Sequence, residues 1–115
     1  MPPNCWLIKV DNDCSVCGRR QYRLNGEFAI DPGDLLIFYY RDWNDHAIAC
    51  CVAYAIDVNY KSSWGTETII TLNRHTSVKV DLLNILPKTF SFNRSGVTPL
   101  GVYCNQVKGN LGIWV

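Results

Sequence analysis

The sequence has almost no net charge and no long apolar run, and each absence excludes a class of protein. Lysine and arginine together number 11 against 10 acidic residues, so the formal net charge is +1. A chain this close to neutrality does not bind nucleic acid through bulk basicity, and any such binding must rest on a local patch. The strongest apolar runs, LLIFYY and AIACCVAYAI, are much shorter than the roughly 20 residues of a membrane-spanning helix. We therefore expect no membrane partner.

The amino terminus lacks a secretion signal, because MPPNCWLIKV has no basic region followed by an apolar stretch. We therefore predict a soluble, cytoplasmic (intracellular) protein. Its 115 residues are enough for a single domain, 1–115, with one modest core, and a content of 48% hydrophobic residues is typical of a globular chain. The sequence ends at Trp114 and Val115, inside an apolar segment, which fits a domain cut from a longer polypeptide as well as a terminal strand.

Motifs that carry catalysis are also missing. There is no G-x-S-x-G, no H-E-x-x-H and no phosphate-binding glycine loop. His46 and His75 are the only histidines, and neither lies in a catalytic sequence. We predict that the protein is not an enzyme. The alternative of a thiol enzyme would require one cysteine whose thiol pKa is lowered.

Strand-like runs replace helical periodicity along the chain. No long window keeps an apolar period of 3.6 residues. Strands are predicted at residues 6–10, 35–40, 47–57, 68–72, 89–92, 97–104 and the terminal LGIWV. Residues 14–25 are predicted as a loop or one short helical turn, and residues 78–86 as alternation that ends in a helical turn before Pro87. The sequence therefore predicts a mainly β fold with little helix, a compact twisted β-barrel of six or seven short strands.

The six cysteines stand at positions 5, 14, 17, 50, 51 and 104. An even number in a small secreted domain would suggest disulfides. Because no secretion signal is present, we expect reduced thiols instead. Cys50 and Cys51 are adjacent inside an apolar run, where thiols usually behave as small buried hydrophobes.

Cys14 and Cys17 form a C-x-x-C pair that supports more than one interpretation. Two thiolates at this spacing on a tight turn can chelate zinc, but a structural site needs four ligands and no second C-x-x-C pair exists. Completion of the site would fall to Cys5, His46, His75 or Cys104. A redox pair would normally open a helix after a strand, which the polar residues before Cys14 do not favour. Free thiols on a loop remain the favoured interpretation, with zinc as the one cofactor considered.

Aromatic and basic residues gather in the loops. Trp43 and Trp64 each lie in a polar loop, and a loop tryptophan either folds back onto the core or lines a site. Arginine suits a nucleic-acid site because its planar guanidinium both donates to phosphate and stacks on bases. The basic candidates are Arg19, Arg20, Arg23, Arg41, Lys61 and Arg74. A solvated basic face is the alternative.

Residues 18–40, GRRQYRLNGEFAIDPGDLLIFYY, carry a family resemblance. They follow a strand with an aromatic residue, CWLIKV, and residues 18–25 approximate the pattern G-x-R-N-Y-x-A-R-N. A Gly33-Asp34 turn then leads into a strand that contains Phe38-Tyr39. In this order the motifs resemble the EVE domain of the PUA-like superfamily, which also contains ASCH and YTH domains. The likeness covers about the first half of the chain; Gln21 stands in place of the usual Asn, Cys17 in place of a Trp, and the family's helical insertions are missing.

The resemblance implies a twisted β-barrel whose pocket accepts a flipped or unpaired modified base of DNA or RNA. The resemblance implies that Arg20, Gln21 and Tyr22 bind the base, with Tyr39 or Tyr40 near the rim of the pocket. From chemistry alone we add Trp43 and Trp64 as stacking residues and Asn44 as an amide that reads a base edge. Phosphate binding is assigned to Arg19, Arg23, Arg41, Lys61 and Arg74.

These inferences combine into a non-enzymatic reader of a modified base, in particular a methylated one. Such domains often serve as the reading head of a larger polypeptide, including modification-dependent restriction systems. The alternative is a small protein-interaction β-barrel stapled by zinc through Cys14 and Cys17. Stoichiometric zinc without affinity for oligonucleotides would favour that alternative.

Overall fold

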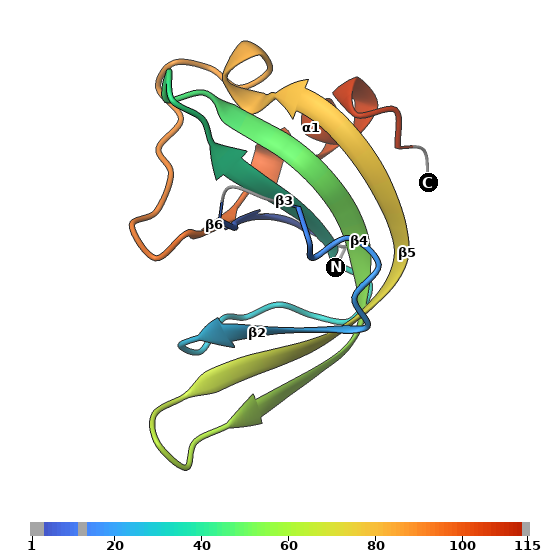
Figure 1. Cartoon of the computed structure of the whole chain (residues 1–115), viewed down its shortest axis with the longest axis vertical. Coiled ribbons are helices and arrows are strands. Elements are labelled where there is room, and N and C mark those ends of the chain that lie inside the picture. Colours follow the sequence, from blue (N-terminus) through green and yellow to red (C-terminus); the bar gives the residue numbers. More distant parts are fainter. Residues whose placement is uncertain (1–3, 12–13, 114–115) are drawn as a thin grey trace.

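A computed structural model of the chain describes residues 4–11 and 14–113, which are built on one strongly curved β-sheet (Figure 1). The described strands are β1 (Cys5–Lys9), β2 (Gln21–Asn25), β3 (Leu35–Arg41), β4 (Ala47–Lys61), β5 (Glu67–Asp81) and β6 (Val97–Pro99). The described helical segments are η1 (Leu82–Asn84), η2 (Gly101–Tyr103) and α1 (Cys104–Asn110). The predicted mainly β fold with little helix is confirmed. Within the described residues, no helix is long and apolar enough to span a membrane.

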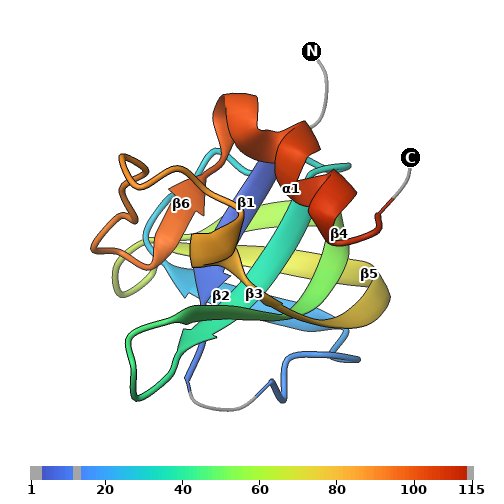
Figure 2. The ribbon, with the colours of Figure 1, turned by 90° about the horizontal axis from the view of Figure 1, so that it is seen from above.

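The sheet has the order β2-β5-β4-β3-β1-β6. β1 and β3 run parallel, and the other neighbouring strands are antiparallel. β4 and β5 bend sharply part of the way along, so the sheet curls into a half-barrel and β2 comes to lie below β1 and β3 (Figure 1). Viewed from above, α1 and η1 lie over the other face of β1, β3 and β4 (Figure 2).

Each face of the sheet carries its own hydrophobic core, because successive side chains of a strand point to opposite faces. The inner core lies within the curl and contains Trp6, Ile8, Val16, Leu24, Ile30, Leu36, Phe38, Cys51, Ala53, Ala55, Ile70, Leu72 and Val97. The helix core lies under the helical segments and contains Cys5, Leu7, Leu35, Ile37, Tyr39, Ala47, Ala49, Val52, Leu82, Leu86, Leu100 and Val107. The run at residues 35–40 is apolar throughout because β3 contributes to both cores.

The two central strands are longer than the sequence predicts. β4 and β5 each span 15 residues and remain paired around the bend. The polar residues Asn73, Arg74 and His75 carry no strand signal, yet they lie inside β5. The β4–β5 ladder shifts register at three places, and Arg74 has a positive φ of 55°. Bulges of this kind bend a strand without ending it, so the ladder continues where the sequence suggests a break.

Other predicted elements also differ from the structure. Residues 89–92 form no strand, because Phe90 and Phe92 instead pack edge to face, with ring centroids 5.2 Å apart. The strand predicted at residues 97–104 ends at Pro99, and the chain continues through η2 into α1. The predicted terminal strand is absent from residues 111–113; Trp114 and Val115 lie outside the described residues. β2 occupies part of the segment predicted as a loop or helical turn. The helical turn before Pro87 is confirmed as η1.

All six cysteines are paired, as Cys5–Cys104, Cys14–Cys50 and Cys17–Cys51. The prediction of reduced thiols is therefore wrong for this structure, and in this form Cys14 and Cys17 have no thiolate to offer zinc. The pairing could not be predicted from the order of the cysteines in the sequence, because the bonded residues are between 34 and 99 positions apart. Disulfides are typical of oxidising compartments, whereas the sequence favoured the cytoplasm. The location stays a prediction.

Candidate ligand-binding site at strand β2

A surface hollow lies beside the first residues of β2. It has a volume of about 390 Å³ and is lined by Arg19, Gln21, Tyr22 and Arg23. A smaller recess of about 120 Å³ is lined by Val10, Asp11, Ser15, Val16, Arg19 and Tyr22. The two hollows share Arg19 and Tyr22 and therefore adjoin. We refer to them together as the β2 pocket.

The alternation of β2 explains which side chains reach this pocket. Gln21, Arg23 and Asn25 are exposed, whereas Tyr22 and Leu24 point toward the inner core. The Tyr22 ring packs edge to face on Phe38, with a centroid distance of 5.2 Å and an interplanar angle of 70°. Tyr22 is only half-buried, so part of its ring remains open to the pocket. The core thus holds an aromatic ring in place at the wall of a cavity.

The charges around Tyr22 supply both donors and acceptors. Burial raises the pKa of the Tyr22 hydroxyl, the charge of Asp11 raises it further, and Arg19 lowers it. A phenol whose pKa lies above its ordinary value stays protonated at neutral pH and keeps its O–H as a donor. Arg19 adds guanidinium donors, and Asp11 adds carboxylate acceptors. The sequence interpretation missed Asp11, whose one signal is its place directly after a predicted strand.

The side chains of the other basic residues around β2 are exposed. Arg20 is exposed, and its carbonyl accepts the backbone N–H of Leu72 at 2.7 Å. Arg23 Nη1 lies 3.7 Å from Glu67 Oε2, in an ion pair whose side chains are 58% and 37% exposed. Exposed pairs of this kind contribute about 0–1 kcal/mol, so Arg23 can leave Glu67 for a phosphate at little cost.

Trp64 and Lys61 lie at the tip of the β4–β5 hairpin, beyond the end of β2. Both side chains are exposed. Trp64 has a relative accessibility of 100% and packs against neither hydrophobic core. The backbone N–H of Gly26 donates to Thr66 at 2.7 Å, which joins this tip to the turn after β2. Among the described residues, neither Trp64 nor Lys61 lines the β2 pocket.

Trp43 lies at the opposite end of the molecule. The β3–β4 turn that carries it is at the top of Figure 1, whereas the β4–β5 tip that carries Trp64 is at the bottom. The described part of the chain is 39 Å long in its longest direction. One cage built from both tryptophans is therefore excluded. Trp43 is also fully exposed, at 103%, so neither tryptophan folds back onto the core.

The other residues predicted to bind a base or phosphate lie at the β3–β4 turn, in the helix core or in a separate hollow. Tyr39 is 1% exposed and packs in the helix core against Phe92, so its predicted place at a rim is wrong. Adjacent strand residues point to opposite faces, and Tyr40 instead lines a cavity of about 260 Å³ with Arg41, Asp42 and Trp43. The Arg41 guanidinium lies 4.6 Å from the Phe92 ring centroid. Arg74 lines a separate hollow beside Gly33.

Hydrogen bonds to Asp42 hold the β3–β4 turn in one shape. Asp42 Oδ1 accepts the backbone N–H groups of Asn44 and His46, each at 2.9 Å. Asp45 has a positive φ of 62°, and its carbonyl accepts Arg41 Nη1 at 2.9 Å. These contacts present Trp43 and Asn44 at the tip of an ordered turn. The nearby charges are largely acidic, so the turn does not suit a phosphate backbone.

Acid is expected to loosen this turn. The backbone N–H of His46 is the main cause that lowers the pKa of Asp42 from its ordinary value. A lowered folded-state pKa means that Asp42 stabilises the turn above the unfolded-state pKa, and that this stabilisation is lost as the pH falls through the folded-state value. In NMR titrations, the Asn44 and His46 amide shifts should change with a midpoint below the ordinary pKa of an aspartate. Asp42→Asn should abolish this transition. A midpoint at or above the ordinary aspartate pKa would contradict the hydrogen-bonded arrangement.

No protein-family model matches the chain, and no curated protein matches it. The interpretation of the site therefore rests on its own geometry. The structure brings together Arg19, Gln21, Tyr22 and Arg23 from the sequence-predicted set, and it adds Asp11, Val10 and Val16 to them.

Proposed function

We propose that the protein binds nucleic acid at the β2 pocket and accepts one unpaired or flipped base there, as a reader of a modified base. One observation carries the proposal: Arg19, Gln21, Tyr22 and Arg23, each assigned to nucleic-acid binding from the sequence, line a single cavity of about 390 Å³. That volume lies in the range of roughly 300–1,000 Å³ typical of small-molecule pockets.

The side chains of the pocket suit the parts of a nucleotide. The Tyr22 ring offers a stacking surface, and stacking contributes about 1–3 kcal/mol per base. Asp11 provides an acceptor for an exocyclic amino group, and Gln21 provides an amide that pairs with a base edge. Val10 and Val16 form the small apolar part of a recess that is otherwise mostly polar. A methyl group placed against them gains about 0.8 kcal/mol, which favours the methylated base modestly.

Arg19 and Arg23, which line the same hollow as Tyr22, would contact the flanking phosphates, with Arg20 next to Arg19 in the sequence. Few phosphate contacts on a nearly neutral chain should give a shallow dependence of affinity on salt. A curled, mainly β sheet is what we expect of an EVE-type domain of the PUA-like superfamily, and kinship with that family is part of the proposal. In that case the chain acts without catalysis, as the specificity module of a larger polypeptide such as a modification-dependent restriction system.

Tyr22→Ala is expected to weaken binding to an oligonucleotide with one methylated or hydroxymethylated base by about 5- to 150-fold, because it removes the stacking ring. Tyr22→Phe keeps the ring and its packing on Phe38, and should lose much less. Fluorescence anisotropy with labelled single strands, beside unmodified strands, measures both. Trp43→Ala and Trp64→Ala serve as matched controls outside the pocket and should bind like the wild type.

Two results would overturn the proposal. One is the absence of binding to any oligonucleotide at low salt. The other is an affinity that survives Tyr22→Ala but falls with Trp43→Ala, which would move the site to the β3–β4 turn.

A second candidate function is protein binding through the β3–β4 turn. The fully exposed Trp43 on a hydrogen-bonded turn has the properties of an interface anchor, since tryptophan is enriched among residues that dominate binding energy. Asp42 and Asp45 beside it favour a partner with basic residues. Loss of a protein partner with Trp43→Ala, while Tyr22→Ala keeps it, would distinguish this function from base reading.

A further inference from the structure

Two pairs of cysteines meet at one place on the inner face of β4. Cys14 is bonded to Cys50 and Cys17 to Cys51, with Cα–Cα distances of 6.0 and 5.7 Å. The Cys17 backbone N–H donates to the Cys14 carbonyl at 3.1 Å, so residues 14–17 form a tight turn that holds its two cysteines close together. All four side chains belong to the inner core or pack against it.

A β-bulge at Cys50 is what turns both strand cysteines to this face. Adjacent residues in a regular strand point to opposite faces. Here Phe38 pairs with Cys51 and Tyr39 with Ala49, so Cys50 is an extra residue without a partner on β3. The ladder to β5 shifts register at the same position. Ala49 accordingly belongs to the helix core and Cys51 to the inner core. Bulges are common next to functional sites, where they redirect a side chain.

We propose that these four cysteines form a tetrathiolate zinc site when the protein is reduced, and that the two disulfides are the oxidised form of this site. Zinc binds four thiolates in a tetrahedron with Zn–S distances of about 2.3 Å, which sets the sulfurs roughly 3.8 Å apart. Sulfurs in a disulfide are about 2.0 Å apart, so each pair must open, and the two pairs must converge on one point, when the site forms. Cys50 and Cys51 thus supply the two ligands that the C-x-x-C motif lacks.

The conversion balances as thiol–disulfide exchange followed by metal binding. Two molecules of a dithiol reductant each give two electrons and two protons; both S–S bonds break, four thiols form, and each reductant becomes a disulfide. One Zn²⁺ then displaces the four thiol protons and is bound by four thiolates. Among the described residues of the disulfide-bonded form, no group of three or more His, Cys, Asp or Glu is arranged to hold a metal. Paired sulfurs carry no thiolate, so this site exists only after reduction.

The surroundings of the cluster suit a zinc thiolate. Ser77 Oγ lies 3.5 Å from Cys17 Sγ, where its hydroxyl can donate to a thiolate, and such outer contacts orient metal ligands. Arg19 and Arg20 directly follow the turn in the sequence and add positive charge next to it. Cys51 is fully buried, whereas Cys14, Cys17 and Cys50 are partly exposed, so metal and reductant have access from one side. Val16, between the two turn cysteines, lines the recess of the β2 pocket.

The test loads the full chain with Zn²⁺ alone after reduction with excess dithiol and removal of the reductant under argon. Native mass spectrometry should find one zinc per reduced chain and none on the oxidised chain. Co²⁺ in place of zinc should give the visible bands of tetrahedral tetrathiolate cobalt. Zinc should also raise the melting temperature of the reduced chain, because a ligand that binds the folded state stabilises it.

Substitutions identify the ligands. Cys17→Ser, in the partly exposed turn, and Cys51→Ser, in the strand, should each lose stoichiometric zinc and the cobalt spectrum. Cys104→Ser alters the third disulfide, on the other face of the sheet, and should still bind one zinc. The inference is overturned if the reduced chain takes up no zinc, including when it fails to fold with zinc present. It is equally overturned if Cys104→Ser loses zinc as readily as Cys17→Ser.

Discussion

Loss of the Cys5–Cys104 disulfide is expected to lower the free energy of unfolding by about 2–5 kcal/mol. This bond joins residues 99 positions apart, and cross-links that close long loops restrict the unfolded chain most. Within the chain-entropy account, a loop of about 100 residues corresponds to roughly 4.7 kcal/mol. A loss near the top of this range would remove a large part of the stability of a small domain.

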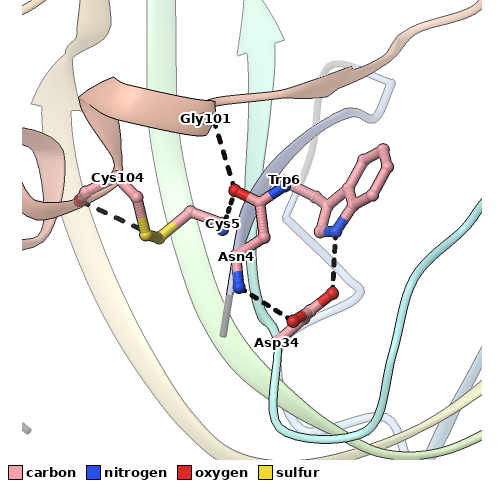
Figure 3. Close-up of a disulfide and its surroundings, with 6 residues drawn as sticks. All are labelled: Asn4, Cys5, Trp6, Asp34, Gly101 and Cys104. Atoms are coloured by element: carbon pink, nitrogen blue, oxygen red, sulfur yellow. Dashed lines mark hydrogen bonds between the residues drawn. A yellow bond between two sulfur atoms is a disulfide. The ribbon is translucent and has the colours of Figure 1, made fainter. Parts of the chain in front are cut away.

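The disulfide also fastens α1 to β1, the strand next to the edge strand β6. Cys5 opens β1, which lies between β3 and β6, and Cys104 opens α1 (Figure 3). Asn4 Oδ1 accepts the backbone N–H groups of Cys5 at 2.8 Å and Gly101 at 3.2 Å, so hydrogen bonds support the same junction. When the bond is absent, we expect the helical segments to separate from the helix core before the sheet unfolds.

Urea unfolding of Cys5→Ala, Cys104→Ala and the double variant measures this effect under oxidising conditions. If the covalent bond is the cause, each single variant and the double variant should be destabilised by nearly the same amount. Effects of the two single variants that add in the double variant would show that packing, and not the cross-link, is responsible.

Asp34→Ala is expected to destabilise the fold by about 2–5 kcal/mol, because it leaves one buried and two part-buried donors without their acceptor. Asp34 is 3% exposed. Its Oδ2 accepts Trp6 Nε1 at 3.0 Å, and its Oδ1 accepts the Asn4 backbone N–H at 2.9 Å (Figure 3). The same Oδ2 also accepts the Asp31 backbone N–H at 2.9 Å. One carboxylate therefore joins the Pro-Gly turn, β1 and the largest side chain of the inner core.

Asp31→Ala is the matched control, because its carboxylate lies in the same turn but is exposed. It should change stability by no more than about 0.5 kcal/mol. Asp34→Asn should fall between the two, since an amide offers one acceptor oxygen in place of two. Thermal unfolding followed by tryptophan fluorescence compares the three variants. Equal melting temperatures for Asp34→Ala and Asp31→Ala would show that the hydrogen bonds to Asp34 contribute little.

Local patterns predicted the elements that local chemistry determines. The Asp-Pro-Gly-Asp turn and the strand after it follow from backbone preferences and from an apolar run, and both are present. The residues at the start of β2 adjoin one another in the chain, so their predicted proximity required no knowledge of the fold. The same holds for the helical turn that ends before Pro87.

The sequence did not predict which side chains of a strand face which side of the sheet, nor how long a strand is. A run that is apolar on both faces does not show which of Tyr39 and Tyr40 is buried. The bulge at Cys50 reverses the alternation of β4 without a sequence signal, and for this reason two thiols taken as core residues proved to be partners of Cys14 and Cys17. The β4–β5 hairpin is long enough to separate Trp43 from Trp64, but its length could not be predicted, because β5 includes polar residues that suggest a loop.

The Cys5–Cys104 bond has a mechanical consequence. Tension applied to the two ends of the chain would travel from Cys5 to Cys104 through two side chains whose Cα atoms are 5.3 Å apart, and it would bypass the sheet. The segment between the two cysteines, whose 99 residue steps would measure about 350 Å when fully extended, would then carry no tension. Both candidate binding surfaces lie inside this segment, so tension applied to the two ends of the chain would leave their geometry unchanged for as long as the disulfide is intact.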